Sequence, residues 1–79
     1  MQRRAARRTE HFIAQLPDVS RLLSNGTSAG MSVERALGMA AVEVPEPART
    51  ELNRVVAQLG LGWALDASLT DLSERMPSR

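Results

Sequence analysis

Few side chains in this sequence have the type and spacing that catalysis or metal binding requires. His11 is the single histidine and cysteine is absent, which excludes a thiolate nucleophile and a cysteine-based zinc site. No carboxylate pair or serine arrangement completes a catalytic triad or a metal cage around His11. We interpret His11, which directly precedes Phe12, as a surface or half-buried side chain. The sequence predicts no catalytic residue, no metal site and no cofactor.

Two other features resemble parts of ligand sites. Asp66, Asp71 and Glu74 have the spacing of carboxylates on one exposed helix face. We interpret them as a solvated face, with a cation site as the alternative. The Gly60-Leu61-Gly62 segment resembles part of a nucleotide-binding loop, but neither a preceding strand nor a lysine accompanies it. The segment therefore does not predict a phosphate site.

The chain begins with a cluster of basic residues. Its members, all ahead of the first acid, are Arg3, Arg4, Arg7 and Arg8. From Glu10 onward six arginines stand against nine acids, although the whole chain has a net charge of only +1. The cluster is either a solubilising tail, a segment beside an anionic membrane surface, or a contact for nucleic-acid phosphates. No aromatic residues alternate with these arginines, which disfavours nucleic acid.

The elements that would position these residues are helices, because apolar residues recur at helical spacing and do not alternate as in strands. Four stretches show the pattern: Phe12, Leu16, Val19 and Leu23; Val33, Ala36, Leu37, Ala40, Ala41 and Val44; Leu52, Val55, Val56 and Leu59; and Leu65, Leu69, Leu72 and Met76. With 79 residues, the chain is long enough for one small domain. We predict an all-α fold, a compact bundle of about four short amphipathic helices.

Glycine, serine and proline separate the four stretches. Gly30 is placed to end the first helix in the left-handed conformation, and Ser32 to cap the second. Pro45 ends the second helix, and Pro47 suits the first turn of the third. Gly60 and Gly62 separate the third helix from the fourth.

Three positions are harder to interpret. Pro17 lies inside the first apolar stretch, so we predict that a helix starts or kinks there, with the arginine segment frayed or helical before it. Residues 24–28 are poor helix formers, and local propensity would end the helix at Asn25. Trp63 is interpreted as a core residue in preference to an exposed contact for a partner.

Several short motifs follow one another in a recognisable order. They are Gln15-Leu16-Pro17-Asp18, Leu22-Leu23, Ala29-Gly30-Met31-Ser32, Ala36-Leu37, Glu51-Leu52 with Val55, Leu59 with Gly62, Leu65 and Leu69, and Ser73-Glu74-Arg75-Met76-Pro77-Ser78. In this order they resemble the cytoplasmic domain of the type II secretion system F family, in the branch of the TadB and TadC platform proteins of Tad/Flp pili. The likeness covers about residues 12–78.

This resemblance implies a non-enzymatic platform for pilus assembly or type II secretion. Family members are inner-membrane proteins whose helical cytoplasmic domains are tethered to transmembrane helices, and they couple a cytoplasmic hexameric ATPase to pilin movement. Residues 1–11 are then a basic juxtamembrane segment on the cytoplasmic side, able to contact anionic lipid. Residues 12–79 are the helical cytoplasmic domain, which is itself soluble. The resemblance also extends the first helix through Ser28 to Gly30.

A platform works through contacts with its partners, here the ATPase and other platform subunits. The candidate contact residues are charged positions on the predicted polar faces: Arg35, Glu43, Arg49, Arg54, Asp71 and Glu74. Relatives usually continue with two further cytoplasmic helices, so the chain resembles an excised fragment or a shortened relative with apolar stripes left uncovered. We therefore expect it to self-associate.

The alternative function is a small helical DNA-binding or regulatory protein, with the second and third helices as a helix-turn-helix. Two prolines in the turn oppose it, and the third helix offers only Arg49 and Arg54 among acids. Nucleic acid is accordingly not an expected partner. An enzyme fragment is a third possibility, which no residue supports.

Overall fold

Four α-helices make up the described part of the chain. The computed structural model describes the backbone of residues 2–76, and side chains from residue 6 onward. The helices are α1 (Gln2–Ser28), α2 (Val33–Glu43), α3 (Ala48–Gly60) and α4 (Leu65–Arg75), and no strand occurs among these residues. The predicted all-α bundle of four helices is confirmed.

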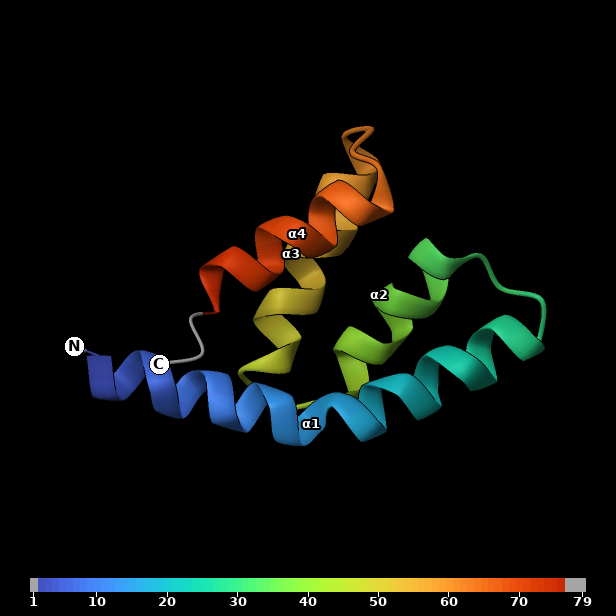
Figure 1. The fold of residues 1–79 in the computed structure, drawn as a ribbon. Coiled ribbons are helices and arrows are strands. Elements are labelled where there is room, and N and C mark those ends of the chain that lie inside the picture. The colour runs from blue at the N-terminus through green and yellow to red at the C-terminus, as the bar shows by residue number, and fades with distance from the viewer. Residues whose placement is uncertain (1, 77–79) are drawn as a thin grey trace.

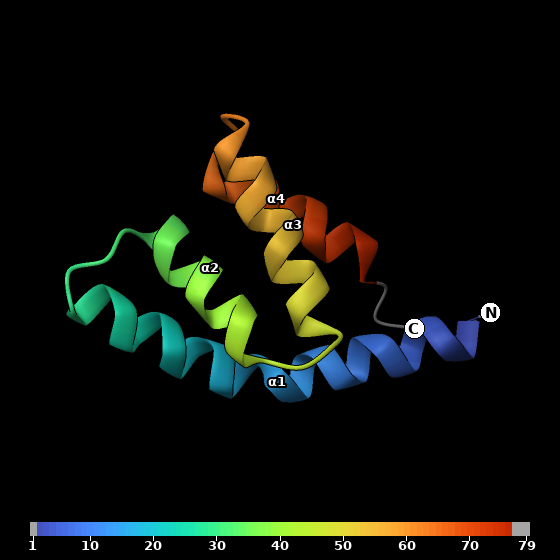
Figure 2. The same cartoon turned by 180° about the vertical axis from the view of Figure 1, so that it is seen from behind.

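The helix α1 runs along the whole length of the molecule (Figures 1 and 2). A helix of this length measures about 40 Å, which agrees with the longest dimension of the described chain, 40 × 25 × 16 Å. The helix α2 packs against both α1 and α3, and α4 packs against α3. The last turn of α4 comes back to the N-terminal half of α1, where Thr9 contacts Met76.

The core is built by the first three helices and the loop between α2 and α3. Its buried apolar residues are Phe12, Val19, Leu37, Ala40, Ala41, Val44, Ala48, Leu52 and Val55. Small alanines on α2 and at the start of α3 let the helix backbones approach one another. In α4 the one buried residue is Ser68, while Leu72 and Met76 are partly buried against the core.

The start of α1 differs from the sequence-based prediction. The helix begins at Gln2 and continues through Pro17, so a helix start near Pro17 is excluded. The alternative prediction, a longer helix that kinks there, agrees with the bend near the middle of α1 (Figure 1). The Pro17 side chain lies on the exposed face of α1, so its ring meets no neighbouring helix. The residues before it are held by their own contacts, since Thr9 and Phe12 are buried. These contacts offset the roughly 3 kcal/mol that proline costs inside a helix.

The end of α1 follows the resemblance and not the local propensity. The helix continues past Asn25 to Ser28, and Gly30 ends it with φ of +93°, as predicted. The Met31 N–H donates to the Gly26 carbonyl at 3.0 Å, which satisfies one of the last carbonyls of the helix. The predicted cap of α2 is also present, because the Ser32 hydroxyl accepts a hydrogen bond from the Arg35 N–H at 3.1 Å.

The two remaining connections are short. The Glu46–Pro47 peptide bond is cis, and Pro47 stands immediately before the first residue of α3, one position earlier than predicted. Gly60 is the last residue of α3, and Gly62 has φ of +99° in the turn to α4. Trp63 is 43% exposed in this turn, so its interpretation as a core residue is wrong. The turn projects from the end of the α3–α4 pair (Figure 1), where no core is available to cover the indole.

Candidate functional site

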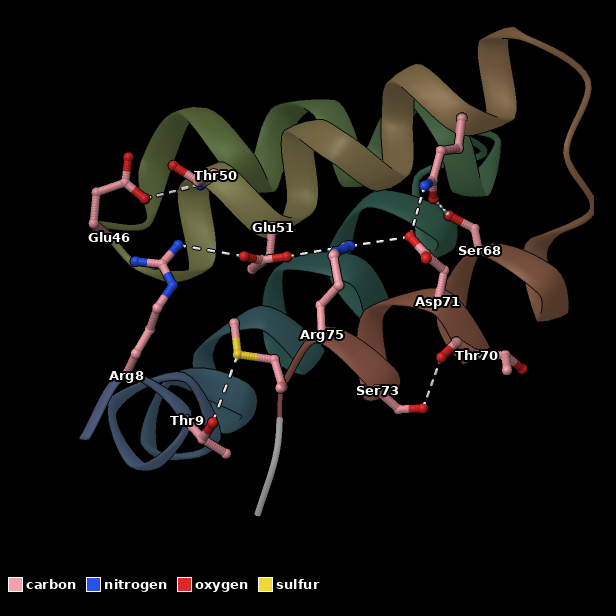
Figure 3. Close-up of polar contacts among 12 residues, drawn as sticks. Arg8, Thr9, Glu46, Thr50, Glu51, Ser68, Thr70, Asp71, Ser73 and Arg75 are labelled. Carbon is pink, nitrogen blue, oxygen red and sulfur yellow. Dashed lines mark hydrogen bonds and ion pairs between the residues drawn. The ribbon is translucent and has the colours of Figure 1, made fainter. Parts of the chain in front are cut away.

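An ion-pair network centred on one buried carboxylate joins three of the four helices. Its centre is Glu51 on α3, whose side chain is 7% exposed. The Glu51 Oε2 atom lies 3.3 Å from Nη2 of Arg8 on α1, and Oε1 lies 3.1 Å from Nη2 of Arg75 on α4 (Figure 3). One carboxylate therefore pairs with guanidinium groups that are far apart in the sequence.

The network continues along the contact between α3 and α4. Arg75 Nη1 donates to Asp71 Oδ2 at 3.0 Å, and Gln58 Nε2 donates to the same oxygen at 2.8 Å. Gln58 Oε1 in turn accepts a hydrogen bond from the hydroxyl of Ser68, which is fully buried. We call this set the Glu51 network; its members are Arg8, Glu51, Gln58, Ser68, Asp71 and Arg75.

The position of Glu51 in the sequence explains why it is buried. Glu51 directly precedes Leu52 and stands four residues before Val55, so it lies on the apolar face of α3. Arg8 has the same relation to Phe12 on α1. Sequence reasoning used Glu51 only as a motif residue and missed the network. A charged residue one helical turn from a core residue was the available signal.

The structure distributes the candidate contact residues over three helices. Five of the six are exposed: Arg35, Glu43, Arg49, Arg54 and Glu74. Asp71 instead belongs to the Glu51 network and is 33% exposed, which differs from the expected solvated carboxylate. Arg49 also makes an internal contact, because its Nε donates to the Val44 carbonyl at 3.1 Å.

The N-terminal arginines lie on α1 and are continuous with the bundle. The backbone of Arg3 and Arg4 is helical, and their side chains lie outside the described part. Arg7 and Arg8 are both exposed, and Arg8 also pairs with Glu51. The helix α1 has no break at the predicted boundary after residue 11, where His11 is exposed.

A basic pocket of about 330 Å³ lies beside this end of α1. Arg7, Arg8 and His11 line it together with Glu46 and Pro47. Hydrogen bonding by Thr50 holds the pKa of the Glu46 carboxyl below its ordinary value of 4.5, and the charges of Arg49 and Arg8 add to the effect. An internal carboxylate therefore already stands among the cations of this pocket.

An apolar groove of about 220 Å³ separates α1 from α4. Its walls are Thr9, Phe12, Ile13, Leu69, Leu72, Ser73 and Met76. Ile13 is 54% exposed and Leu69 is 46% exposed. This groove is an apolar surface of the kind that protein partners cover.

The described residues contain neither a metal-binding cluster nor a membrane-spanning helix. No group of three or more histidine, aspartate or glutamate side chains is placed to hold a metal ion in residues 2–76. Within the same residues, no helix combines the length and the apolar character needed to cross a membrane.

The domain is thus helical, with a basic pocket and an apolar groove on its surface. The model of one family, described as type II secretion system (T2SS), protein F, matches residues 19–79, which include the last ten residues of α1 and all of α2, α3 and α4. The chain belongs to this family. Neither the curated proteins nor the solved structures gave a significant match.

Family membership confirms the broader part of the resemblance. The family comprises membrane-associated platform proteins of secretion and pilus systems, and its domain is a non-enzymatic platform domain. The chain is therefore a domain of a secretion or pilus platform.

Proposed function

We propose that this chain is the cytoplasmic domain of an inner-membrane platform protein of the TadB/TadC type, which serves Tad/Flp pilus assembly or type II secretion. In this function the domain performs no reaction. It couples a cytoplasmic hexameric ATPase to pilin movement through contacts with the ATPase and with other platform subunits. The observation that carries the proposal is the family match across α2, α3 and α4.

The exposed charged residues are the proposed contacts for these partners. Arg35 and Glu43 lie on α2, Arg49 and Arg54 on α3, and Glu74 on α4. Asp71 contributes less in this proposal, because Arg75 and Gln58 already bind its carboxylate. Exposed charges steer association and fix its orientation more than they add affinity.

We propose that residues 1–11 form the juxtamembrane segment and residues 12–79 the helical domain, at the cytoplasmic face of the membrane. The basic cluster then lies against anionic lipid headgroups, as the positive-inside rule expects. Because α1 extends from Gln2 to Ser28 as one helix, a displacement of the membrane-proximal end is passed directly to the bundle.

We propose that the chain associates with further copies of itself through its exposed apolar side chains. Ile13, Leu69 and Val42 are large apolar side chains with exposed fractions of 54%, 46% and 75%. Burying such side chains against a second copy is favourable by roughly 25 cal/mol for each Å² removed from water.

The test of the main proposal is a binding measurement with the cognate hexameric secretion ATPase. The immobilised chain is expected to capture the ATPase, and the paired change Arg35→Glu with Arg54→Glu is expected to weaken capture at least tenfold. Arg21→Glu, which alters an exposed arginine of α1 that is not among the proposed contacts, is the control and should keep most of the binding. Capture that is absent, or insensitive to both variants, contradicts the proposed contacts.

The DNA-binding alternative is tested by measuring the affinity of the chain for duplex DNA at two salt concentrations. The platform proposal expects no tight binding at either concentration. Tight binding with a steep loss of affinity at the higher salt would overturn it.

A further inference from the structure

The helix α4 contributes little to the apolar core. Leu65 and Leu69 are 38% and 46% exposed, while Leu72 and Met76 are only partly buried. Among the residues whose side chains the structure describes, the buried apolar ones come from α1, α2, α3 and the loop between α2 and α3. Apolar burial, the dominant favourable term in folding, therefore stabilises the first three helices much more than it stabilises the docking of α4.

Polar contacts hold α4 in place instead. Ser68, Asp71 and Arg75 recur at intervals of three and four residues, so they share the face of α4 that meets α3. Ser68 and Asp71 both bind Gln58, and Arg75 pairs with Glu51. Figure 3 shows these side chains pointing toward one another between the two helices.

The pairing of Arg75 in this network is incomplete. Its Nη2 lies 3.1 Å from Glu51 Oε1, but the contact lacks hydrogen-bond alignment. Its buried Nε has no hydrogen-bond partner among the described protein atoms. Removing charges from water is costly, and imperfect pairing returns only part of that cost. The network therefore fixes where α4 docks while adding little net free energy to the docked state.

The connection between α3 and α4 permits separation of the two helices. It is a short turn in which Gly62 has φ of +99° and Leu61 is 80% exposed. Neither residue packs into the core, but the Gly62 and Trp63 N–H groups cap α3 by donating to the Leu59 and Gln58 carbonyls at 3.0 Å each. A separation that leaves this cap in place therefore needs changes of backbone angle only at residues 63–64, before the first residue of α4.

We propose that α4 is a detachable helix, so that the domain has a closed state, in which the Glu51 network is formed, and an open state, in which α1, α2 and α3 stay folded and α4 is released. Opening uncovers the apolar wall of α1 at Phe12 and makes the buried carboxylate of Glu51 accessible to a partner, beside Arg8, which is exposed in both states. This conformational change goes beyond the proposed platform function and does not depend on it.

Native-state hydrogen exchange of the full chain at low urea concentrations tests the proposal. The amides of α4 are expected to exchange at least about tenfold faster than the slowest amides of α2 and α3, and with a weaker dependence on urea, because opening exposes less surface than global unfolding. Equal rates and equal urea dependence in α2, α3 and α4 would overturn the proposal.

Two variants and a matched control connect the opening to the Glu51 network. Glu51→Gln is expected to accelerate exchange in α4 by a further factor of about ten or more, while α2 changes by less than about threefold, since breaking a buried pair leaves the partner charge unpaired. Asp18→Asn disrupts the exposed Asp18–Arg21 pair of α1, at 3.7 Å, and should leave α4 unchanged. Arg75→Gln removes the same pair from the α4 side. If Glu51→Gln does not fold, Arg75→Gln replaces it in the test, and it should likewise accelerate exchange in α4 much more than in α2. Equal acceleration in α2 and α4 would make Glu51 an ordinary core residue and refute the proposal.

Discussion

Two glycines differ in how much space surrounds them: Gly26 is crowded by a neighbouring helix, and Gly38 is not. A Cβ atom on Gly26 of α1 would lie 2.9 Å from the Cβ of Ala36 on α2, closer than real Cβ atoms approach. A Cβ atom on Gly38, in the middle of α2, would have no neighbour within 4 Å. The same substitution therefore tests packing at one site and helix propensity at the other.

We expect Gly26→Ala to lower the free energy of unfolding by about 1 kcal/mol. Overpacking costs roughly 1–3 kcal/mol, whereas the gain in helix propensity is at most about 1 kcal/mol. Gly38→Ala, the matched control, is expected to raise the free energy of unfolding by up to about 1 kcal/mol. Urea denaturation of both variants measures the two values. A gain in stability for Gly26→Ala would show that α1 and α2 separate there without cost.

The positions of the later helices follow from the sequence alone. Each of α2, α3 and α4 overlaps an apolar stretch of helical spacing, and Gly30 and Ser32 mark one boundary through local backbone chemistry. Such signals are predictable because they act between residues close in the chain. The start of α1 was not predictable in this way, since contacts of Thr9 and Phe12 with the rest of the molecule override the signal from Pro17.

The Glu51 network could not be predicted because it depends on how separate helices meet. Arg8 and Glu51 are 43 residues apart, and no local rule pairs them. The sequence indicates that each is charged, and the spacing of Glu51 to Val55 indicates the buried face. Only the packing of α1, α3 and α4 brings the three partners together.

One side chain of α1 holds the loop between α2 and α3. The Gln15 Nε2 atom donates to the Pro45 carbonyl at 2.8 Å, and its Oε1 accepts from the Ala48 N–H at 2.9 Å. Ala48 is fully buried, so its N–H has no access to solvent. Gln15 therefore connects α1 to the first turn of α3.

We expect Gln15→Ala to lower the free energy of unfolding by about 1–3 kcal/mol, the usual cost of leaving a buried donor unsatisfied. Gln15→Glu keeps an acceptor for the Ala48 N–H and loses the amide donor to the Pro45 and Glu46 carbonyls. Its loss should be smaller than that of Gln15→Ala at acid pH, where the protonated carboxyl can donate in place of the amide. Thermal unfolding followed by circular dichroism ranks the two variants. If both lose the same amount, the bond to Ala48 is not the stabilising contact.

The charge of the whole molecule is unevenly distributed along its long axis. Four arginines lie in the first eight residues, and nine acids follow among six further arginines. Since α1 spans the 40 Å length of the molecule, the basic residues gather at one end. A negatively charged surface should therefore bind the molecule in one orientation, with the basic end of α1 toward it.

We expect the chain to bind vesicles that contain phosphatidylserine, and binding to weaken by roughly a hundredfold when Arg3, Arg4 and Arg7 are all changed to Gln. Each arginine near an anionic surface contributes about 1 kcal/mol. Changing Arg21, Arg35 and Arg54 to Gln alters the net charge equally on other parts of the molecule and should weaken binding much less. Vesicle sedimentation measures both. Equal losses would assign binding to net charge and not to the N-terminal cluster.

The position of Trp63 makes it an intrinsic fluorescence probe of the turn between α3 and α4. It is the single tryptophan in a chain without tyrosine, and it lies in the turn between α3 and α4, 43% exposed. Indole emission shifts in wavelength with the polarity around the ring, so fluorescence from this protein originates at one known point. Movements of the turn can thus be followed in real time with no added dye.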